Sequence, residues 1–90
     1  MPDRYPWLWD VEMDSASFDA LLAGMIDPGP RERTWALLRL IEYAPYSEIR
    51  RLLPLDYFLK MWPEISGRVR SLSRRDGMDF YYSRRLQRMT

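Results

Sequence analysis

Residues 31–43 constrain the fold more than any other stretch, because seven aromatic or aliphatic side chains crowd into thirteen positions between Pro30 and Pro45. At about 100° per helical residue, five of these side chains fill one arc that covers more than half of the helix circumference. A helix this apolar has to be surrounded by other segments, so we expect it at the centre of a single hydrophobic core. The five side chains of the arc are Ala36, Leu37, Leu38, Leu40 and Ile41.

One amphipathic helix is predicted before this central helix. Asp14 or Ser15 can act as its N-cap, since either side chain accepts a hydrogen bond from the free backbone N–H groups. Residues 27–30, with the sequence Asp-Pro-Gly-Pro, are expected to end it. Its apolar residues recur at i, i+3, i+4 and i+7, and they are Phe18, Leu21, Leu22 and Met25.

Turn-forming residues divide the chain after the central helix. Ser47 is expected to cap a short third helix that Pro54 ends. Asp56 is expected to cap the next segment, whose apolar stripe crosses Pro63 as one kinked helix or two nearly collinear ones. Gly77, in the left-handed conformation, is expected to stop that segment. The stripe consists of Phe58, Met61, Ile65, Val69 and Leu72.

The two ends of the chain are expected to differ from the middle. Pro6 keeps the residue before it out of helical geometry, so Trp7 and Trp9 should point to the same side of an extended arm. Residues 79–90 can form a helix capped by Asp79, although the run Phe-Tyr-Tyr that begins at Phe80 also has strand propensity.

These features predict an all-α fold, a compact single-domain bundle of about five short helices with an extended aromatic N-terminal arm. Residues 1–13 would form the arm, residues 14–75 the helical core, and residues 78–90 a basic C-terminal helix or tail. The sequence shows no signal-peptide pattern, and no apolar run approaches the roughly 20 residues of a membrane span. We therefore expect a soluble, cytoplasmic protein without a membrane partner.

The composition gives little support for catalysis, because the chain has no His and no Cys. It therefore lacks the commonest general base, the commonest zinc ligand and a thiolate nucleophile. Asp10, Glu12 and Asp14 have the spacing that opens a calcium loop, but Ser15 and Leu21 stand where that loop needs Gly and Glu. We predict no catalytic residue, no metal site and no cofactor, and hence a protein that is not an enzyme.

The charge is divided unevenly along the chain. Residues 1–45 carry a net charge of −4 and residues 46–90 a net charge of +5. The basic end combines arginines with aromatic residues, a combination that contacts phosphates and stacks on bases in nucleic-acid-binding proteins. The alternative is that these arginines form the solvated faces of two amphipathic helices. The residues concerned are Arg74, Arg75, Tyr81, Arg84, Arg85 and Arg88.

Trp35 departs from the pattern of the central helix, because it projects onto the polar side with Arg39. The aromatic arm could fold back and cover Trp35, with Arg39 stacked on its face. Alternatively, Trp35 could be an exposed aromatic anchor for another protein. We favour the covered arrangement, since a large exposed Trp is uncommon on a monomer.

Three segments resemble a bacterial family of small proteins encoded beside nucleotidyltransferase-like toxins of the abortive-infection type. They are residues 7–14 (WLWDVEMD), residues 35–43 and residues 47–53 (SEIRRLL), and the run RRDGMDFY at residues 74–81 is similar to the ending of some members. The resemblance implies an all-helical antitoxin that binds and neutralises its cognate toxin. On that reading the basic tail would contact the toxin or the RNA on which it acts. The partner-binding residues would be Trp7, Trp9, Asp10, Trp35 and Arg39.

Overall fold

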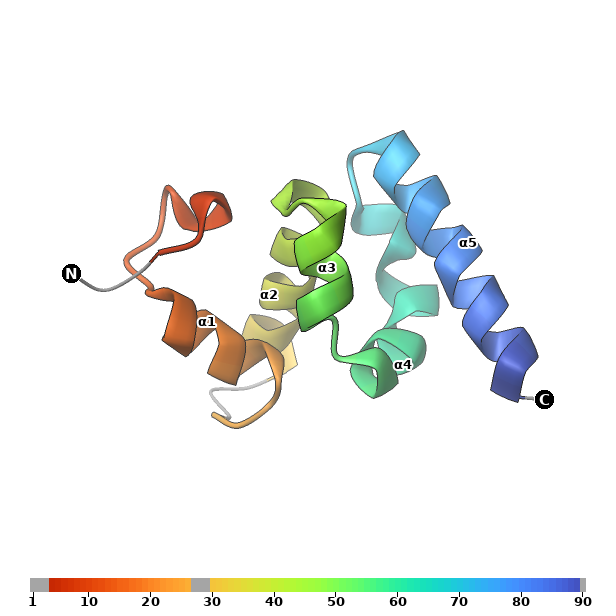
Figure 1. Ribbon diagram of the computed structural model, residues 1–90, viewed down its shortest axis with the longest axis horizontal. Helices are drawn as coiled ribbons and strands as arrows, with labels where there is room; N and C mark the ends of the chain where they lie inside the picture. The colour runs from red at the N-terminus through yellow and green to blue at the C-terminus, as the bar shows by residue number, and fades with distance from the viewer. Residues whose placement is uncertain (1–3, 27–29, 90) are drawn as a thin grey trace.

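The computed structural model describes residues 4–26 and 30–89, and within these residues it contains only helical elements joined by turns and loops. The all-α prediction is therefore confirmed. Figure 1 shows the N-terminal arm and α1 at one end of the molecule, α2 and α3 in the middle, and α5 at the other end. The molecule is elongated, with extents of 43 × 26 × 21 Å. In chain order the elements are η1 (Pro6–Leu8), α1 (Ser15–Leu22), α2 (Pro30–Tyr43), α3 (Tyr46–Leu52), α4 (Leu55–Ile65), η2 (Ser66–Arg68) and α5 (Leu72–Met89).

Helix α2 is the centre of the core, as the apolar arc of residues 31–43 predicts. It contacts η1 and α1 on one side and α4 and α5 on the other. Four residues of its arc are fully buried, and Leu38 is half-buried. The largest side chains around it are also fully buried, and they come from three different segments: Leu8 of η1, Phe18 of α1, and Phe58 and Trp62 of α4.

Helix α1 ends earlier than expected, at Leu22, because Gly24 adopts a φ of +78°. The backbone N–H of Met25 bonds to the carbonyl of Ala20, and the N–H of Gly24 bonds to that of Leu21. This pair of bonds is the Schellman motif that commonly closes helices. Met25 therefore lies outside the helix and is 80% exposed, contrary to the predicted stripe. Residues 27–29, part of the predicted stop, lie outside the described residues.

Two further helix starts differ from the sequence prediction. Pro45 precedes α3 as its N-cap and Pro54 precedes α4, whereas we expected caps at Ser47 and Asp56. Both prolines have extended backbone angles, and proline is well tolerated at a helix start because its missing N–H would have no intrahelical partner there. Asp14, in contrast, caps α1 as expected and accepts a bond from the backbone N–H of Ser17.

The predicted stripe across Pro63 is interrupted. Helix α4 includes Pro63 but ends at Ile65, and η2 follows it. Val69 remains buried just after η2, whereas Leu72 begins α5 and is 65% exposed. The chain therefore turns into a new helix instead of continuing along the same axis.

The predicted stop at Gly77 is wrong, because α5 runs without a break from Leu72 to Met89. Gly77 does not have a positive φ. A Cβ at this position would instead meet the hydroxyl of Tyr46 at 3.1 Å, so close approach of α3 to α5 accounts for the glycine. The helical core, predicted to end at residue 75, and the C-terminal segment, predicted to begin at residue 78, are therefore parts of one continuous helix.

The alternative that residues 79–90 form a strand is also wrong up to Met89, where α5 ends. Asp79 lies inside α5 and, instead of capping a helix, accepts a hydrogen bond from Trp62 Nε1 at 2.7 Å.

The arm is only partly extended. Tyr5 has extended backbone angles, but residues 6–8 form the 3₁₀ turn η1. Trp7 and Trp9 consequently do not share one side as strand residues would, since Trp7 is 3% exposed and Trp9 is 59% exposed. None of the helices in the described part of the chain has both the length and the hydrophobicity that a membrane span requires.

Candidate functional site

Arg39 of α2 fixes the end of the N-terminal arm to the body of the protein. Its guanidinium group forms a bidentate ion pair with Asp10, with N–O distances of 2.8 and 3.2 Å. It also donates a longer bond of 3.4 Å to the backbone carbonyl of Trp7. The hydrogen bonds from Arg39 hold the pKa of the Asp10 carboxyl below its usual range. The ion pair therefore attaches the arm to α2.

Three aromatic rings surround the same guanidinium group. Its central carbon lies 4.9 Å from the ring centroid of Trp9, 5.2 Å from that of Trp35 and 5.3 Å from that of Tyr43. Trp35 is half-buried and Arg39 lies over its face, as the favoured interpretation predicts, but no ring contact between the arm and Trp35 is found among the described residues. Phe18 of α1 covers another side of Trp35 in an edge-to-face contact. Trp35 is therefore not an exposed anchor.

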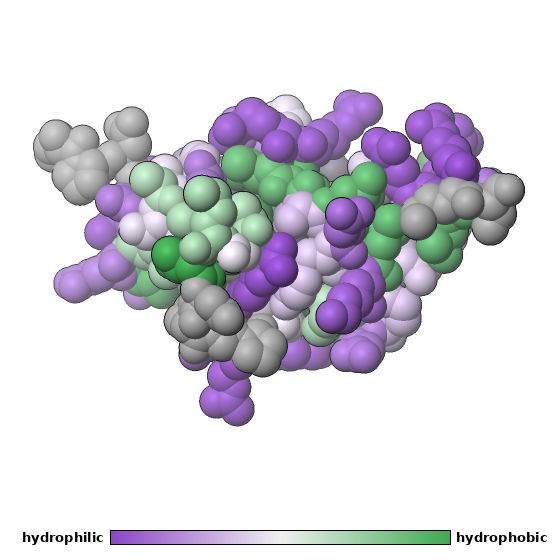
Figure 2. Space-filling model, turned by 90° about the horizontal axis from the view of Figure 1, so that it is seen from below, coloured by the Kyte–Doolittle hydropathy of each residue, from purple (hydrophilic) through white to green (hydrophobic). Residues whose placement is uncertain are grey.

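Trp9 and Tyr43 form an exposed pair, which we call the aromatic ridge. Their rings meet edge to face with centroids 4.8 Å apart. Trp9 is 59% exposed and Tyr43 is 45% exposed. Figure 2 shows the molecule from below, where hydrophobic areas lie among hydrophilic side chains. The aromatic ridge is notable because two exposed rings lie together and share one fixed cation.

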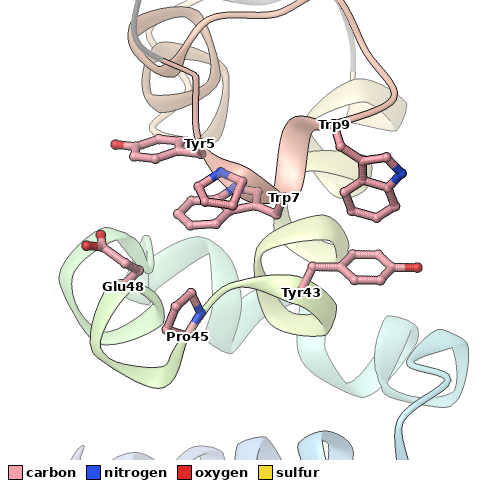
Figure 3. A pocket seen from close by; sticks show the side chains of 7 residues that line it. Tyr5, Trp7, Trp9, Tyr43, Pro45 and Glu48 are labelled. Atoms are coloured by element: carbon pink, nitrogen blue, oxygen red, sulfur yellow. The ribbon is translucent and has the colours of Figure 1, made fainter.

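An apolar groove of about 430 Å³ lies on one side of the aromatic ridge. Figure 3 shows it between the arm, with Tyr5 and Trp7, and the start of α3, with Pro45 and Glu48. A second groove, of about 420 Å³, shares Trp9 and Tyr43 but is lined mainly by polar side chains. Its other lining residues are Asp10, Trp35, Leu38, Arg39, Glu42, Arg68 and Arg70.

Tyr5 holds the wall of the apolar groove in place. Its ring stacks on Trp7 with centroids 4.3 Å apart. Its hydroxyl group is 3.0 Å from both carboxylate oxygens of Asp19 and accepts a bond of 3.2 Å from Arg51. Burial is the main cause that raises the pKa of the Tyr5 hydroxyl. The arm, α1 and α3 are therefore tied together at one point, which gives the groove a preformed shape.

The predicted partner-binding residues are thus brought together, but they play different parts. Trp9 is exposed, whereas Asp10 and Arg39 fasten the arm. Trp7, proposed from the sequence as an anchor, is a core side chain with one edge on the groove. Sequence reasoning missed Tyr43 as a site residue. Its position four residues after Arg39, and hence on the same helix face, was the available signal.

The predicted basic set does not form one surface. The guanidinium group of Arg74 donates to the backbone carbonyls of Ile41 and Ala44, at the end of α2. Arg75 Nε is buried and has no hydrogen-bond partner among the described residues. Tyr81 is half-buried with its ring near that of Phe58. Tyr81 nevertheless lines one hollow with the remaining three arginines, Arg84, Arg85 and Arg88, and its hydroxyl accepts a bond of 3.1 Å from Arg85. Arg50 and Phe80, which are not in the predicted set, line the same hollow.

No arrangement of three or more acidic residues in residues 4–26 and 30–89 is suited to hold a metal ion. Two of the acids with calcium-loop spacing have other partners, since Asp10 pairs with Arg39 and Asp14 caps α1. Comparison with protein-family models, with curated proteins and with solved structures gave no match.

Proposed function

We propose that this protein is a non-catalytic binding module that docks on a partner protein through the aromatic ridge. The observation that carries the proposal is the exposure of Trp9 and Tyr43 on a rigid base, beside a preformed apolar groove. Aromatic side chains of this kind dominate the energy of many protein interfaces, because they bury a large area at a small cost in conformational entropy.

Rigidity supports the same proposal. Arg39 already packs against both rings of the ridge and is paired with Asp10, so the ridge needs little ordering when it binds. Such preorganisation raises affinity because less conformational freedom is lost on association. A hydrophobic side chain of the partner would enter the groove between Tyr5 and Pro45, while the ridge would lie against the partner's surface.

The resemblance described above supplies the candidate partner, a nucleotidyltransferase-like toxin encoded by the neighbouring gene. On this proposal the protein is the antitoxin, and it neutralises the toxin by forming a stoichiometric complex. The structure is compatible with such a role because a small, rigid helical protein can cover a site on a larger enzyme.

Co-expression with the product of the neighbouring gene, followed by size-exclusion chromatography, tests the partner assignment. A complex with fixed stoichiometry is expected, and toxin activity should fall as the complex forms. Separate elution of the two proteins at micromolar concentration, with the toxin still active, would show that the antitoxin assignment is wrong.

Substitutions in the ridge test the docking surface. Trp9→Ala and Tyr43→Ala should each weaken the complex about 30-fold or more, the size of effect seen at interface hot spots. Leu72→Ala is the matched control, because Leu72 is also large, apolar and 65% exposed but lies at the start of α5. Circular dichroism verifies that each variant is folded. Unchanged affinity in both ridge variants would place the interface elsewhere.

A further inference from the structure

The second half of α5 carries a cationic face with an exposed ring. Phe80, Arg84 and Arg88 recur every four residues, so they lie along one side of the helix with a rise of about 6 Å between neighbours. Phe80 is 66% exposed. The Arg84 guanidinium carbon lies 5.6 Å from the centroid of its ring. A large apolar ring is therefore held at the surface next to cations.

Helix α3 contributes Arg50 to the same surface. Arg50 and five residues of α5, which include Phe80 and Tyr81, line a hollow of about 270 Å³, and we call this surface the basic groove. The other members are Arg84, Arg85 and Arg88. It continues into an apolar hollow of about 320 Å³ that shares Arg50, Phe80 and Tyr81 and reaches Ile49 and Met78. The basic groove thus combines arginine side chains with the rings of Phe80 and Tyr81.

The positive charge of the basic groove is not neutralised within the described residues. The two ion pairs among the described residues are made by Arg39 and Arg51, and neither of these arginines lines the basic groove. Two of the nearby acids are occupied, since Glu48 pairs with Arg51 and Asp79 accepts the bond from Trp62. Asp76, one helical turn before Phe80, is exposed and forms no ion pair with these arginines. Residues 80–90 contain no acidic side chain. Four arginines therefore face a common hollow with no carboxylate of the described chain bound to them.

We propose that the basic groove binds single-stranded nucleic acid. The arginines would contact successive phosphates, and Phe80, with Tyr81 beside it, would provide a face on which a base stacks. Phosphates attract the arginines in any nucleic acid, but an exposed ring gains most from bases that are unpaired. The ring thus favours a single strand over a duplex, in which the base faces are already stacked on each other.

An acidic protein segment is the competing occupant of a cationic groove. It would satisfy the arginines equally well, but it would gain little from a protruding ring held beside cations. This site is separate from the aromatic ridge and does not depend on the partner proposed for it. Failure of one assignment therefore leaves the other intact.

Fluorescence anisotropy with a 15-nucleotide oligo(U) and an oligo(dT) of equal length tests the proposal on the full chain. With up to four phosphate contacts, the logarithm of the affinity should fall with the logarithm of salt concentration with a slope of about −3. Raising NaCl from 50 to 200 mM should then weaken binding about 50-fold. A duplex of the same length should bind less tightly than either single strand.

Variants locate the site. Arg84→Gln with Arg88→Gln should remove most of the binding and make the salt slope shallower by about 1.4. Phe80→Ala should weaken binding about 5- to 150-fold with little change in slope, because it removes stacking and no charge. The matched control is Arg68→Gln with Arg70→Gln, which removes the same charge at the groove beside Trp35. It should leave most of the affinity in place.

Each contrary result overturns the assignment. Absence of oligonucleotide binding at 50 mM NaCl would refute it outright. An equal loss of affinity in the control variant would show that binding depends on overall charge and not on the basic groove. Unchanged affinity in Phe80→Ala would show that no base stacks on Phe80. Tighter binding of poly-glutamate than of oligo(U) of the same charge would identify an acidic protein segment as the occupant instead.

Discussion

At the scale of single residues, Gly24 shows how one backbone angle sets the position of α1. Its φ of +78° closes the Schellman motif, and the space where a Cβ would stand is within 3.0 Å of the Arg33 guanidinium carbon. The same guanidinium group donates from Nε to the carbonyl of Leu22 and lies over the ring of Tyr57. The end of α1 is thus held to α2 and α4.

Gly24→Ala should therefore lower the free energy of unfolding by about 1–2 kcal/mol, because the left-handed conformation is strained for any residue with a Cβ. Urea denaturation followed by circular dichroism measures this. Gly67→Ala is the control, since Gly67 has no positive φ and an added methyl group there would have open space around it, so its change should stay within about 0.5 kcal/mol. Equal effects of the two substitutions would contradict the role given to Gly24.

Asp10 makes the attachment of the arm dependent on pH. Because Arg39 holds the pKa of Asp10 below its usual range, the ion pair adds stability above the unfolded pKa of about 4. This stability is lost as the pH falls from there through the lowered pKa. The difference in Tm between wild type and Asp10→Asn should therefore be greatest at neutral pH and should vanish in stronger acid.

Glu12→Gln, a neighbouring substitution in the same arm, is the control and should differ from wild type in Tm much less at every pH. A Tm difference that persists unchanged at about pH 2, below both pKa values, would refute the electrostatic origin.

At the scale of elements, Arg74 joins two helices that are far apart in the sequence. It projects from the first turn of α5 and donates to the carbonyl of Ile41, in the last turn of α2, and to that of Ala44, directly after α2. Carbonyls at a helix end lack intrahelical partners. Tyr46, at the start of α3, has its ring centroid 5.2 Å from the Arg74 guanidinium carbon. One side chain thus fixes the turn between α2 and α3 against α5. This explains why a basic residue occupies a helix start, where the helix dipole disfavours it.

Arg74→Gln should lower the free energy of unfolding by about 1–3 kcal/mol, because the carbonyls of Ile41 and Ala44 lose a charged donor in a partly buried place. Chemical denaturation measures the effect. Arg70→Gln serves as the control, because the hydrogen bond that ties Arg70 to Glu42 comes from its backbone N–H and survives the substitution. Its side chain is exposed, so a small change is expected. A similar loss in both variants would mean that Arg74 acts through charge alone.

At the scale of the whole molecule, the sequence predicts the parts of the fold that depend on local periodicity. The apolar arc of α2 and the cap at Asp14 are properties of neighbouring residues, and both are found. The role of a glycine depends instead on what lies across from it: Gly24 forms a turn, whereas Gly77 leaves room for Tyr46.

In the candidate sites, too, the sequence does not predict the features that depend on tertiary structure. Trp7 and Trp9 stand two residues apart with similar sequence surroundings, and only the 3₁₀ turn decides that one is buried and the other exposed. Likewise Arg74 and Arg84 belong to one basic run, yet the first caps α2 and the second faces solvent. Arg50 joins the basic groove by tertiary packing alone, so no local pattern indicates it.

The elongated shape places the two proposed sites in different parts of the molecule. The aromatic ridge joins the N-terminal arm to α2, whereas the basic groove lies on α3 and α5, and α5 is at the opposite end from the arm (Figure 1). Substitutions with no shared contacts usually have additive effects. Trp9→Ala should therefore leave oligo(U) affinity within about twofold of wild type, while Arg84→Gln with Arg88→Gln should leave the affinity for the protein partner within the same range.

Measuring both affinities in both variants, and in the variant that combines them, completes the test. Additive free energies, within about 0.5 kcal/mol, would show two independent sites on one small fold. A loss of partner binding in the arginine variant would mean that the partner extends over the basic groove. In that case oligo(U) and the partner should compete for the protein, and pre-bound oligo(U) should slow formation of the protein complex.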